Sequence, residues 1–363
     1  MTHTHFFTGF PGFLGSELLP RVLARSPGSE AVCQVQPRYA SLARGRADEL
    51  ARRFPALRGR IHVAEGDITL PELGLREAGK LRDRVGEVWH LAAVYDLAVA
   101  REPAVRVNVD GTRHVLEFAR RCPALERLHH VSTCYVSGRY RGLFREDDLE
   151  KGQTFNNFYE ETKYLAEAEV HHARRGGMPV TVYRPSVVVG DSATGETQKY
   201  DGPYYVIRWL LRQPRVAVMP VVGDPRATVF NVVPRDFVVD AIAHLSGRAD
   251  TLGHTYALAD PDPLTVDGML AELARATGRR LVRLPLSAKL AKGAIEHVPG
   301  VYRLLRIPAP AVDYFVHPTR YDTAAAQAAL AGSGIRVPRF AEYADRLVRF
   351  VREHPEVSAA AMA

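Results

Sequence analysis

The sequence predicts an α/β fold, a doubly wound parallel sheet with a smaller C-terminal lobe. Short β-branched or apolar runs alternate with helical patterns over residues 1–190, which is typical of βαβ units. A glycine-rich turn separates the first apolar run from the first helical pattern. After Gly190 a polar, turn-rich segment interrupts the alternation, so a second lobe is expected there.

Six short apolar runs are the predicted strands of the sheet. They begin at His5, Ala31, Ile61, Glu87, Arg127 and Pro179. Apolar residues recur at helical spacing between them, at 16–25, 38–54 and 103–121. A further amphipathic pattern at 340–354 predicts a last helix in the C-terminal lobe.

Composition places the chain among ordinary globular proteins. It has 363 residues, of which 46% are hydrophobic and 25% charged, enough for one large α/β unit with an added lobe or for two domains. The net charge of +7 is modest and favours anionic small ligands. Because no cluster of lysine and arginine is interleaved with aromatic residues, we do not expect nucleic-acid binding.

The cysteines and histidines predict neither disulfides nor a metal site. Cys33, Cys122 and Cys134 are odd in number and have no paired spacing, which favours a reducing cytoplasm. The fourteen histidines include no pattern of metal ligands, so no metal is expected. No export signal and no run of 18 apolar residues is found, so we expect a cytoplasmic protein without membrane association.

The glycine-rich turn reads Thr-Gly-Phe-Pro-Gly-Phe-Leu-Gly from Thr8. Glycines at these positions permit a tight turn, backbone approach to a pyrophosphate, and close packing of the following helix, whose N-terminus attracts negative charge. The alternative is a turn without a ligand. We assign the turn to a dinucleotide, with Gly9, Phe10, Gly12, Phe13, Leu14 and Gly15 as its cofactor-binding residues.

The end of the second predicted strand favours NADP(H) over NAD. An acidic residue usually follows there to hold the ribose hydroxyls, but this chain has Gln36, with Arg38 and Arg44 beyond it. Arginine pairs well with a 2′-phosphate, although both arginines could instead be solvated surface residues.

Residues at the ends of the third and fourth predicted strands complete the expected cofactor pocket. Asp67 and Ile68 follow the third strand, where the Asp67 carboxylate could bind the adenine or merely cap its own turn. The fourth strand ends in Leu91, Ala92 and Ala93, whose mostly small side chains would let a cofactor lie close to the backbone.

A tyrosine and a lysine at the start of one helix are the predicted catalytic pair. Tyr159 and Lys163 are four residues apart and share a helix face. A lysine roughly 5.5 Å from the phenol, at an effective dielectric of about 20, contributes ~3 kcal/mol, which is about two pKa units. Lys163 is therefore expected to make Tyr159 a general acid, with Ser132 or Thr133 orienting the same carbonyl oxygen. A solvated Tyr/Lys pair is the alternative.

These motifs together resemble the extended short-chain dehydrogenase/reductase family over most of residues 1–245: TGFPGFLG, GDIT, HLAA, NVDGT, STCYVSG, YEETK and YRPSVVVG occur in the family's order. The resemblance implies a catalytic triad of Thr133, Tyr159 and Lys163, with Ser132 as a substitute for Thr133. It also implies that Arg184, Pro185, Ser186 and Val188 flank the nicotinamide and that Asn108 lies near the active-site helix.

Within that family, FNNFYEETKYLAE and TGFPGFLG look most like the fatty acyl reductases and thioester reductase domains. That branch uses NADPH to reduce acyl thioesters or aldehydes. Gln36 departs from its pattern, since a basic residue tends to stand there. Because no adenylation or carrier domain precedes residue 1, a thioester substrate is expected on coenzyme A or a separate carrier protein.

The predicted protein is thus an NADPH-dependent reductase of an apolar carbonyl substrate: an acyl thioester, a fatty aldehyde or a bulky ketone. Residues 1–190 would form the NADP-binding Rossmann domain, with 228–247 returning to it. Residues 191–227 and 248–363 would form the substrate lobe. A nucleotide-sugar epimerase or dehydratase, a hydroxysteroid-type dehydrogenase and a non-catalytic dinucleotide sensor remain alternatives. A homodimer is possible.

The C-terminal segment bears on the substrate. It is rich in apolar and aromatic residues, namely Val301, Tyr302, Leu304, Leu305, Ile307, Tyr314 and Phe315. These residues could be core of the lobe, the lining of an apolar tunnel, or an amphipathic surface with Lys289, Lys292, Arg303 and Arg306 on its polar side.

Overall fold

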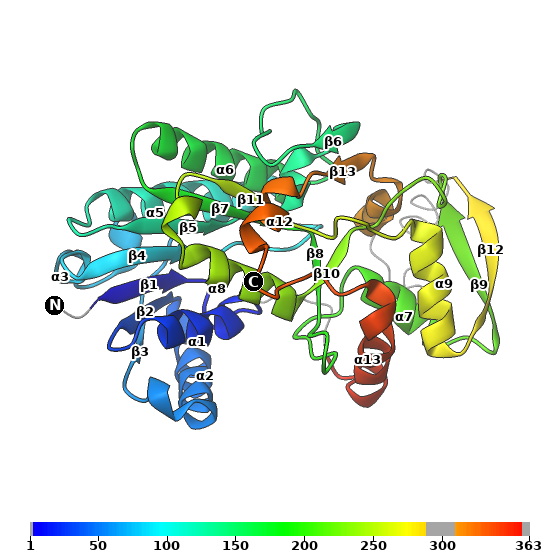
Figure 1. Cartoon of the computed structure of the whole chain (residues 1–363), viewed down its shortest axis with the longest axis horizontal. Coiled ribbons are helices and arrows are strands. Elements are labelled where there is room, and N and C mark those ends of the chain that lie inside the picture. Colours follow the sequence, from blue (N-terminus) through cyan, green and yellow to red (C-terminus); the bar gives the residue numbers. More distant parts are fainter. Residues whose placement is uncertain (1–2, 288–308, 358–363) are drawn as a thin grey trace.

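The computed structural model describes residues 3–287 and 309–357. Its centre is a parallel sheet with the strand order β11-β7-β5-β4-β1-β2-β3 (Figure 1). The strands are β1 (Thr4–Thr8), β2 (Glu30–Val35), β3 (Ile61–Glu65), β4 (Val85–His90), β5 (Arg127–Val131), β7 (Val180–Pro185) and β11 (Thr255–Leu258). The doubly wound Rossmann fold is therefore confirmed, and each of the six predicted strands lies in this sheet.

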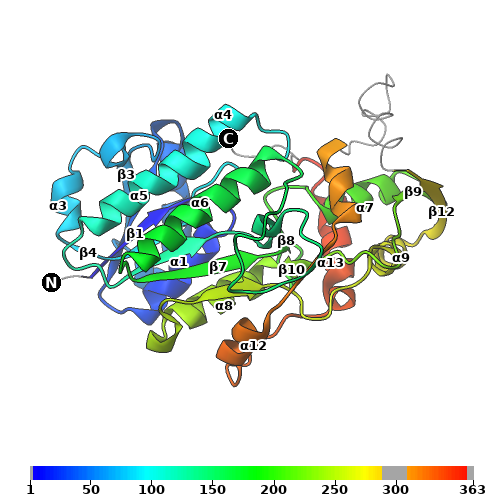
Figure 2. The ribbon, with the colours of Figure 1, turned by 90° about the horizontal axis from the view of Figure 1, so that it is seen from above.

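Helices cover both faces of the sheet (Figure 2). The bounds of those on one face are α1 (Gly15–Arg25), α2 (Ala40–Arg53) and α8 (Arg235–Ser246), and of those on the other α3 (Ala78–Arg82), α5 (Gly111–Arg120) and α6 (Phe158–Arg175). Successive residues of β1 show how the layers form. Phe7 packs with the α1 and α8 side and Phe6 with the α5 and α6 side, because side chains alternate along a strand.

The chain reverses the winding of the sheet between β1 and β4. Strands β2 and β3 extend from one side of β1, whereas β4, β5 and β7 extend from the other. The connections that follow the paired strands β1 and β4 therefore leave in opposite directions, and in open α/β sheets ligands bind in the crevice at such a point. A short helix α4 (Arg101–Ala104) and a π-helical stretch (Val105–Asp110) lead from β4 into α5.

The second lobe has its own apolar core, in which Ile207, Leu210, Leu273 and Leu347 are fully buried. Its elements are α7 (Pro203–Leu211), α9 (Val266–Thr277), α13 (Phe340–Glu353) and the paired strands β9 (Val216–Val222) and β12 (Arg280–Leu286). The predicted helix at 340–354 is α13. Figure 1 shows this lobe beside the carboxyl ends of the sheet strands.

Short parallel strand pairs connect the two parts. They are β8 (Val187–Val189) with β10 (Val232–Pro234), and β6 (Gly142–Phe144) with β13 (Thr319–Tyr321). A 3₁₀ stretch, Ala309–Val316, precedes β13.

The chain returns to the sheet more often than the sequence predicted. Helix α8 packs on α1 through Phe237 and Val238, in line with the expected return of 228–247. Strand β11 and helix α12 (Ala324–Leu330), however, were assigned to the lobe and instead lie with the sheet. The pattern was missed because β11 has only four residues, too few for a clear strand signal.

Candidate active site

The glycine turn follows β1 at the carboxyl edge of the sheet, next to the end of β4, and a side chain at any of its three glycines would clash there. Gly9 has φ +90°, and a Cβ on it would stand 2.7 Å from the Leu91 carbonyl carbon. A Cβ on Gly12 or Gly15 would stand 2.7 or 2.6 Å from the Gly9 carbonyl oxygen. The turn is thus folded tightly on itself under the end of β4, with helix α1 starting at Gly15. This arrangement fits a dinucleotide pyrophosphate.

The larger residues of the turn differ in their surroundings. Phe10 is buried in the core beneath α1, so it could meet a cofactor only through its backbone. Phe13 and Leu14 are half-buried, and the Arg235 guanidinium lies 5.1 Å from the centre of the Phe13 ring.

Arg235, at the start of α8, was not predicted from the sequence. The residue is 3% exposed, and its Nη1 atom has no hydrogen-bond partner among the described residues. Asp191 and Glu196 lie 4.0 and 3.8 Å from its Nη2 atom. No motif signals this residue, because it reaches the turn from 222 residues further along the chain only through the packing of α8.

A hydrogen-bonded chain links the residues after β2 to the loop after β3. Arg38 Nε donates to Gln36 Oε1 at 2.9 Å, and Gln36 Nε2 donates to Asp67 Oδ2 at 3.0 Å. The Arg38 guanidinium also covers the Tyr39 ring at 4.8 Å. Arg44 is paired instead with Glu65, at 2.6 Å. Of the two predicted arginines, Arg38 is therefore the one without a carboxylate partner among the described residues.

Asp67 and Ile68 shape the loop after β3. The second oxygen of Asp67, Oδ1, accepts from the Thr69 backbone N–H at 2.8 Å, which is the turn cap that the sequence left as an alternative. Ile68 is buried, and its side chain occupies the space that a Cβ on Gly111 would need. Any cofactor contact of Ile68 would thus come from its backbone.

Leu91, Ala92 and Ala93 are half-buried at the end of β4, beside the glycine turn. The Ala92 backbone N–H donates to the Thr8 hydroxyl at 3.3 Å, which ties this segment to the end of β1.

The Asn108 side chain is hydrogen-bonded within the protein. Its side chain accepts from the Val94 backbone N–H at 2.8 Å and donates to the Thr162 hydroxyl at 3.0 Å. Asn108 lies in the π-helical stretch and is buried. It therefore fastens the segment after β4 to helix α6, which carries Tyr159 and Lys163.

Thr133 and Tyr159 come together at the carboxyl end of β5. The Thr133 hydroxyl interacts with the Tyr159 phenol, and both residues are buried. Asn157 caps α6 by accepting from the Glu160 N–H at 3.0 Å, which fixes the first turn of the helix and with it Tyr159. Burial raises the pKa of Tyr159, and the contact with Thr133 opposes this rise.

The expected electrostatic effect of Lys163 on Tyr159 is not present in this structure. Lys163 donates from Nζ to the Val131 carbonyl oxygen at 3.0 Å, and burial lowers its pKa to about 8 despite the nearby Glu167. The four-residue spacing does put both residues on α6, but desolvation dominates the pKa of each. The prediction that Lys163 lowers the pKa of Tyr159 is therefore wrong for this arrangement.

Ser132 points away from the pair. Its hydroxyl donates to Glu167 at 2.5 Å, and Glu167 is also bound by Arg184, whose Nε lies 2.9 Å from Glu167 Oε1. Although burial opposes ionisation of Glu167, Arg184 and His171 hold its pKa well below the usual range. Arg184, expected beside the nicotinamide, is thus committed to this buried network.

The segment at the end of β7 contains a buried hydroxyl, that of Ser186, without a hydrogen-bond partner among the described residues. Pro185 ends β7, and its carbonyl oxygen lies 3.4 Å from the Thr133 hydroxyl. Ser186 is buried, and its hydroxyl has no partner among the described residues. Val188 is half-buried against the sheet core. Because buried hydroxyls are normally hydrogen-bonded, Ser186 is consistent with a polar ligand at this edge.

Aromatic side chains surround the Thr133 and Tyr159 hydroxyls. The ring of Tyr95 lies edge-on to Tyr159 with 4.9 Å between centroids, and Tyr135 lies edge-on to both Tyr314 and His317. Phe315 stacks on Phe230 at 5.6 Å. Tyr314 is buried in the core of the lobe, as the core alternative predicted, and Phe315 packs against that core half-buried. Residues 301–308 and both predicted lysines lie outside the described residues.

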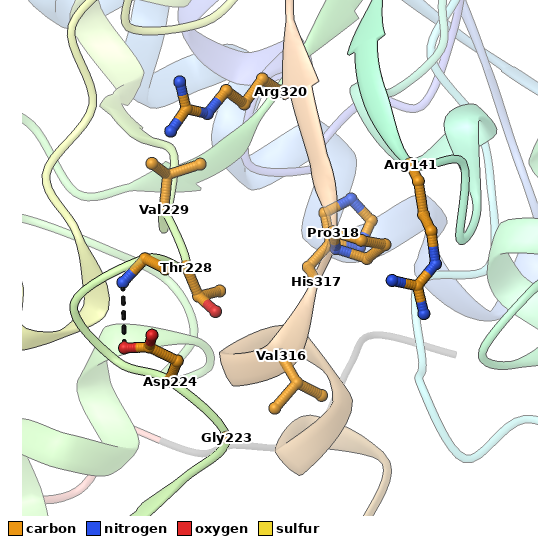
Figure 3. Close-up of a pocket in the computed structure, with 10 residues that line it drawn as sticks. Arg141, Gly223, Asp224, Thr228, Val229, Val316, His317, Pro318 and Arg320 are labelled. Atoms are coloured by element: carbon orange, nitrogen blue, oxygen red, sulfur yellow. Dashed lines mark hydrogen bonds between the residues drawn. The ribbon is translucent and has the colours of Figure 1, made fainter.

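A surface cavity of about 310 Å³ lies next to this aromatic group (Figure 3). His317, which contacts Tyr135, is part of its wall. Arg141 and Arg320 also line it, and neither guanidinium pairs with a carboxylate of the described residues. Val229, Val316 and Pro318 add apolar surface. The cavity thus combines apolar surface with two arginines and the Asp224 carboxylate.

Residues 7–242 match the profile of a family described as male sterility protein, an NAD-binding family. The chain belongs to this family. It is an extended short-chain dehydrogenase/reductase, as its motifs predicted, and the family match supports a nicotinamide dinucleotide as cofactor. The glycine turn and the open Ser186 hydroxyl fit such a group.

Known proteins of two kinds resemble this family member. The chain is 28% identical over 73% of its length to a linear gramicidin synthase of Brevibacillus parabrevis, and 25% identical over 65% to the fatty acyl-CoA reductase wat of Drosophila melanogaster. The match spans only 5% and 52% of those proteins. The terminal R domain of the myxalamid PKS-NRPS pathway superposes with a TM-score of 0.82 at 27% identity, covering 98% of this chain and 92% of that one.

Among the described residues, no helix is both long and apolar enough to cross a bilayer.

Proposed function

We propose that the protein is an NADPH-dependent reductase of an apolar carbonyl compound, an acyl thioester, a fatty aldehyde or a bulky ketone. The observation that carries this proposal is the contact between the Thr133 and Tyr159 hydroxyls at the carboxyl edge of the sheet, the edge that also carries the glycine turn. The buried Lys163 follows Tyr159 on the same helix. The resemblance to a fatty acyl-CoA reductase and to a terminal R domain supports the acyl substrate.

Each side chain has a separate task in this reaction. When bound, the nicotinamide supplies a hydride to the carbonyl carbon. Thr133 and Tyr159 hold the carbonyl oxygen, and Tyr159 donates the proton that this oxygen needs as it becomes a hydroxyl. Lys163, which is mainly cationic at neutral pH, would hold the ribose of the cofactor.

The buried environment suits Tyr159 to the role of acid rather than base. Burial keeps the phenol protonated before the reaction, since it disfavours the phenolate. The Thr133 hydroxyl offsets part of this effect and would stabilise the tyrosine oxygen after the proton leaves. Much of the rate would come from holding the carbonyl in line with these groups.

We further propose NADPH as the cofactor and Arg38 as the residue that binds the 2′-phosphate. Arg38 is exposed at the end of β2 and is held in place by Gln36 and Tyr39. Gln36 occupies the position where an acid would repel the phosphate.

The substrate is proposed to reach Tyr159 from the side of the aromatic group. Tyr95, Tyr135 and Tyr314 provide the apolar surroundings that a long acyl chain requires. The cavity beside His317, with Arg141 and Arg320, would take the anionic part of a coenzyme A or carrier-bound thioester.

A substrate panel tests the proposal. NADPH oxidation is followed with an acyl-CoA thioester, a fatty aldehyde and a steroid ketone, with Tyr159→Phe as the blank. A UDP-sugar is followed by product analysis with NAD added, because epimerisation and dehydration consume no NADPH overall. Turnover of the thioester or the aldehyde supports the reductase. Turnover restricted to the UDP-sugar or the steroid would replace it with the epimerase or hydroxysteroid alternative. Cofactor binding without turnover of a substrate in the panel would favour a dinucleotide sensor.

A further inference from the structure

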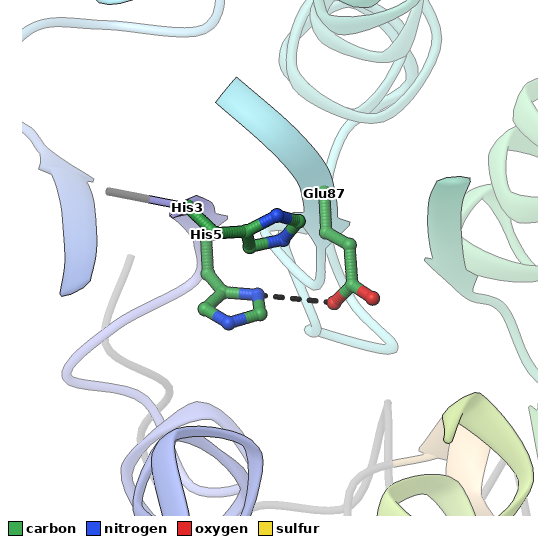
Figure 4. Close-up of side chains that lie close together, drawn as sticks. All are labelled: His3, His5 and Glu87. Carbon is green, nitrogen blue, oxygen red and sulfur yellow. Dashed lines mark hydrogen bonds and ion pairs between the residues drawn. The ribbon is translucent and has the colours of Figure 1, made fainter. Parts of the chain in front are cut away.

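A group of imidazoles and carboxylates lies at the amino-terminal edge of the sheet, opposite to the edge that carries the glycine turn. Figure 4 shows His3 and His5 from the start of β1 next to Glu87 of β4. Glu126, just before β5, lies 3.5 Å from His3 Nδ1. None of these residues takes part in the proposed reaction.

Strand register brings the three residues together. His3 and His5 are two positions apart, so their side chains leave the same face of the chain. The parallel pairing of β1 with β4 sets His5 directly beside Glu87. The imidazole rings of His3 and His5 consequently stand with 4.8 Å between centroids.

The distances suit a small divalent ion. One ligand atom each from His3, His5 and Glu87 lies within 4.8 Å of the others. His5 Nδ1 is 3.0 Å from Glu87 Oε2. Zinc binds such ligands at about 2.0 to 2.1 Å with tetrahedral geometry, which separates neighbouring ligand atoms by roughly 3.3 Å. We propose that His3, His5 and Glu87 bind one zinc ion.

The hydrogen bonds of His5 leave the correct nitrogen for a metal. The Ser29 hydroxyl donates its single proton to the Ser26 carbonyl oxygen at 2.7 Å. With this proton placed there, the hydroxyl accepts from His5 Nε2, which lies 3.2 Å away. In that tautomer the Nδ1 atom directs its lone pair toward the Glu87 carboxylate, where an ion can lie between the two; in the other tautomer Nδ1 donates to Glu87 directly. Metal-bound histidines typically donate from their other ring nitrogen, as Nε2 does in the first tautomer.

Gly86 makes the space that the His3 ring occupies. A Cβ at this position would stand 2.2 Å from His3 Cε1 and 2.6 Å from His3 Nδ1. The ring also borders an open cavity of about 380 Å³, which is lined by Ser26, Glu87 and Glu126 and gives an ion a path from solvent.

Two further groups bear on the charge of the site. Arg25 Nη2 lies 3.2 Å from Glu87 Oε2, so the two carboxylates and this arginine leave one net negative charge when the imidazoles are neutral. His129 is fully buried, and its Nε2 atom, without a hydrogen-bond partner among the described residues, lies 3.6 Å from the same oxygen. His129 Nε2 is therefore a buried nitrogen that points at the Glu87 carboxylate and could act as a hydrogen-bond donor or as a metal ligand.

Zinc titration of the full chain by calorimetry tests the site. The variants are His3→Ala, which removes a ligand, and Gly86→Ala, which keeps every ligand but displaces the His3 ring. His172→Ala, an exposed histidine of α6, is the matched control. The parent and the control should bind one Zn²⁺ per chain, and His3→Ala and Gly86→Ala should bind about tenfold more weakly or worse. Zinc should also raise the melting temperature of the parent more than that of His3→Ala.

The proposal is independent of the reductase activity, because NADPH binding serves only to show that each variant is folded. Absence of one-to-one zinc binding in the parent would overturn it. Equal dissociation constants for the parent and His3→Ala would do the same, and would leave a proton as the group shared by His5 and Glu87.

Discussion

The Ser132 hydroxyl donates a 2.5 Å hydrogen bond to the Glu167 carboxylate, and this contact separates Ser132 from its neighbour Thr133. Thr133 interacts with Tyr159 instead. The two adjacent hydroxyls that the sequence could not rank thus face different partners. Ser132 belongs to a buried ionic network with Arg184, and Thr133 contacts Tyr159, the proposed proton donor.

This difference predicts opposite effects of two substitutions. Thr133→Val should lower kcat by about 10²-fold, because one donor to the carbonyl oxygen is lost. Ser132→Ala should keep kcat within about fivefold and lower the melting temperature, because a buried carboxylate loses one donor. Steady-state kinetics and thermal unfolding of both variants provide the check, with Thr133→Ser expected to restore activity. Loss of kcat only in Ser132→Ala would reverse the assignment.

Replacing Tyr159 by phenylalanine should remove the proton donor without disturbing the fold. We expect kcat to fall by about 10²- to 10⁴-fold while the dissociation constant of NADPH stays nearly unchanged. Tyr164→Phe, on the same helix, is the matched control and should retain activity. A Tyr159→Phe variant with most of the parental kcat at saturating substrate would refute the role of Tyr159 as acid.

The buried Lys163 predicts a loss of activity on the alkaline side. Burial lowers its pKa to about 8, so the ammonium is present below that pH and is lost as the pH rises through it. Because kcat/KM reports the ionisation of the free enzyme, it should fall above about pH 8. In Lys163→Arg the fall should move to higher pH, because a guanidinium stays charged. A profile that is flat to about pH 10 in the parent would show that this charge is not needed.

Arg38 should determine the preference for NADPH. Arg38→Ala is expected to weaken NADPH binding by about 1 to 3 kcal/mol and to leave NADH binding unchanged, since only NADPH carries the 2′-phosphate. Arg44→Ala should have a smaller effect, because Arg44 is paired with Glu65. Fluorescence titration of both cofactors measures these affinities. Equal affinity of the parent for NADPH and NADH would contradict the assignment.

The two arginines of the cavity, Arg141 and Arg320, should contribute to the binding of acyl-CoA thioesters but not of free aldehydes. Arg141→Ala and Arg320→Ala should raise KM for an acyl-CoA substrate and leave KM for the aldehyde of the same chain length unchanged. The effect on the thioester should shrink at high salt, as expected for exposed charges. Equal changes for both substrates would instead indicate damage to the acyl site.

The sheet was predictable because its strands and the glycine turn follow local rules. Alternating apolar runs, and glycines at 9, 12 and 15, need no knowledge of distant contacts. Strand β11 was missed because it has only four residues and enters the sheet late in the chain. The lobe contains elements whose partners are far apart, such as β9 with β12, and their pairing is set by tertiary packing.

The candidate site was predictable in its residue types but not in their partners. The spacing of Tyr159 and Lys163 correctly placed both on α6. It could not show that burial raises one pKa and lowers the other, or that Arg44 is taken up by Glu65. Arg235 and the group of His3, His5 and Glu87 depend on contacts between distant segments, which no local pattern records.

The dependence of kcat/KM on acyl chain length tests the central proposal most directly. NADPH oxidation is measured for acyl-CoA thioesters and aldehydes of increasing length, with Tyr159→Phe as the blank. Each buried methylene should contribute about 0.8 kcal/mol, so kcat/KM should rise severalfold for every two carbons until the site is filled. A flat series for both substrate types, with product analysis showing conversion only of a sugar nucleotide, would contradict the proposed reductase.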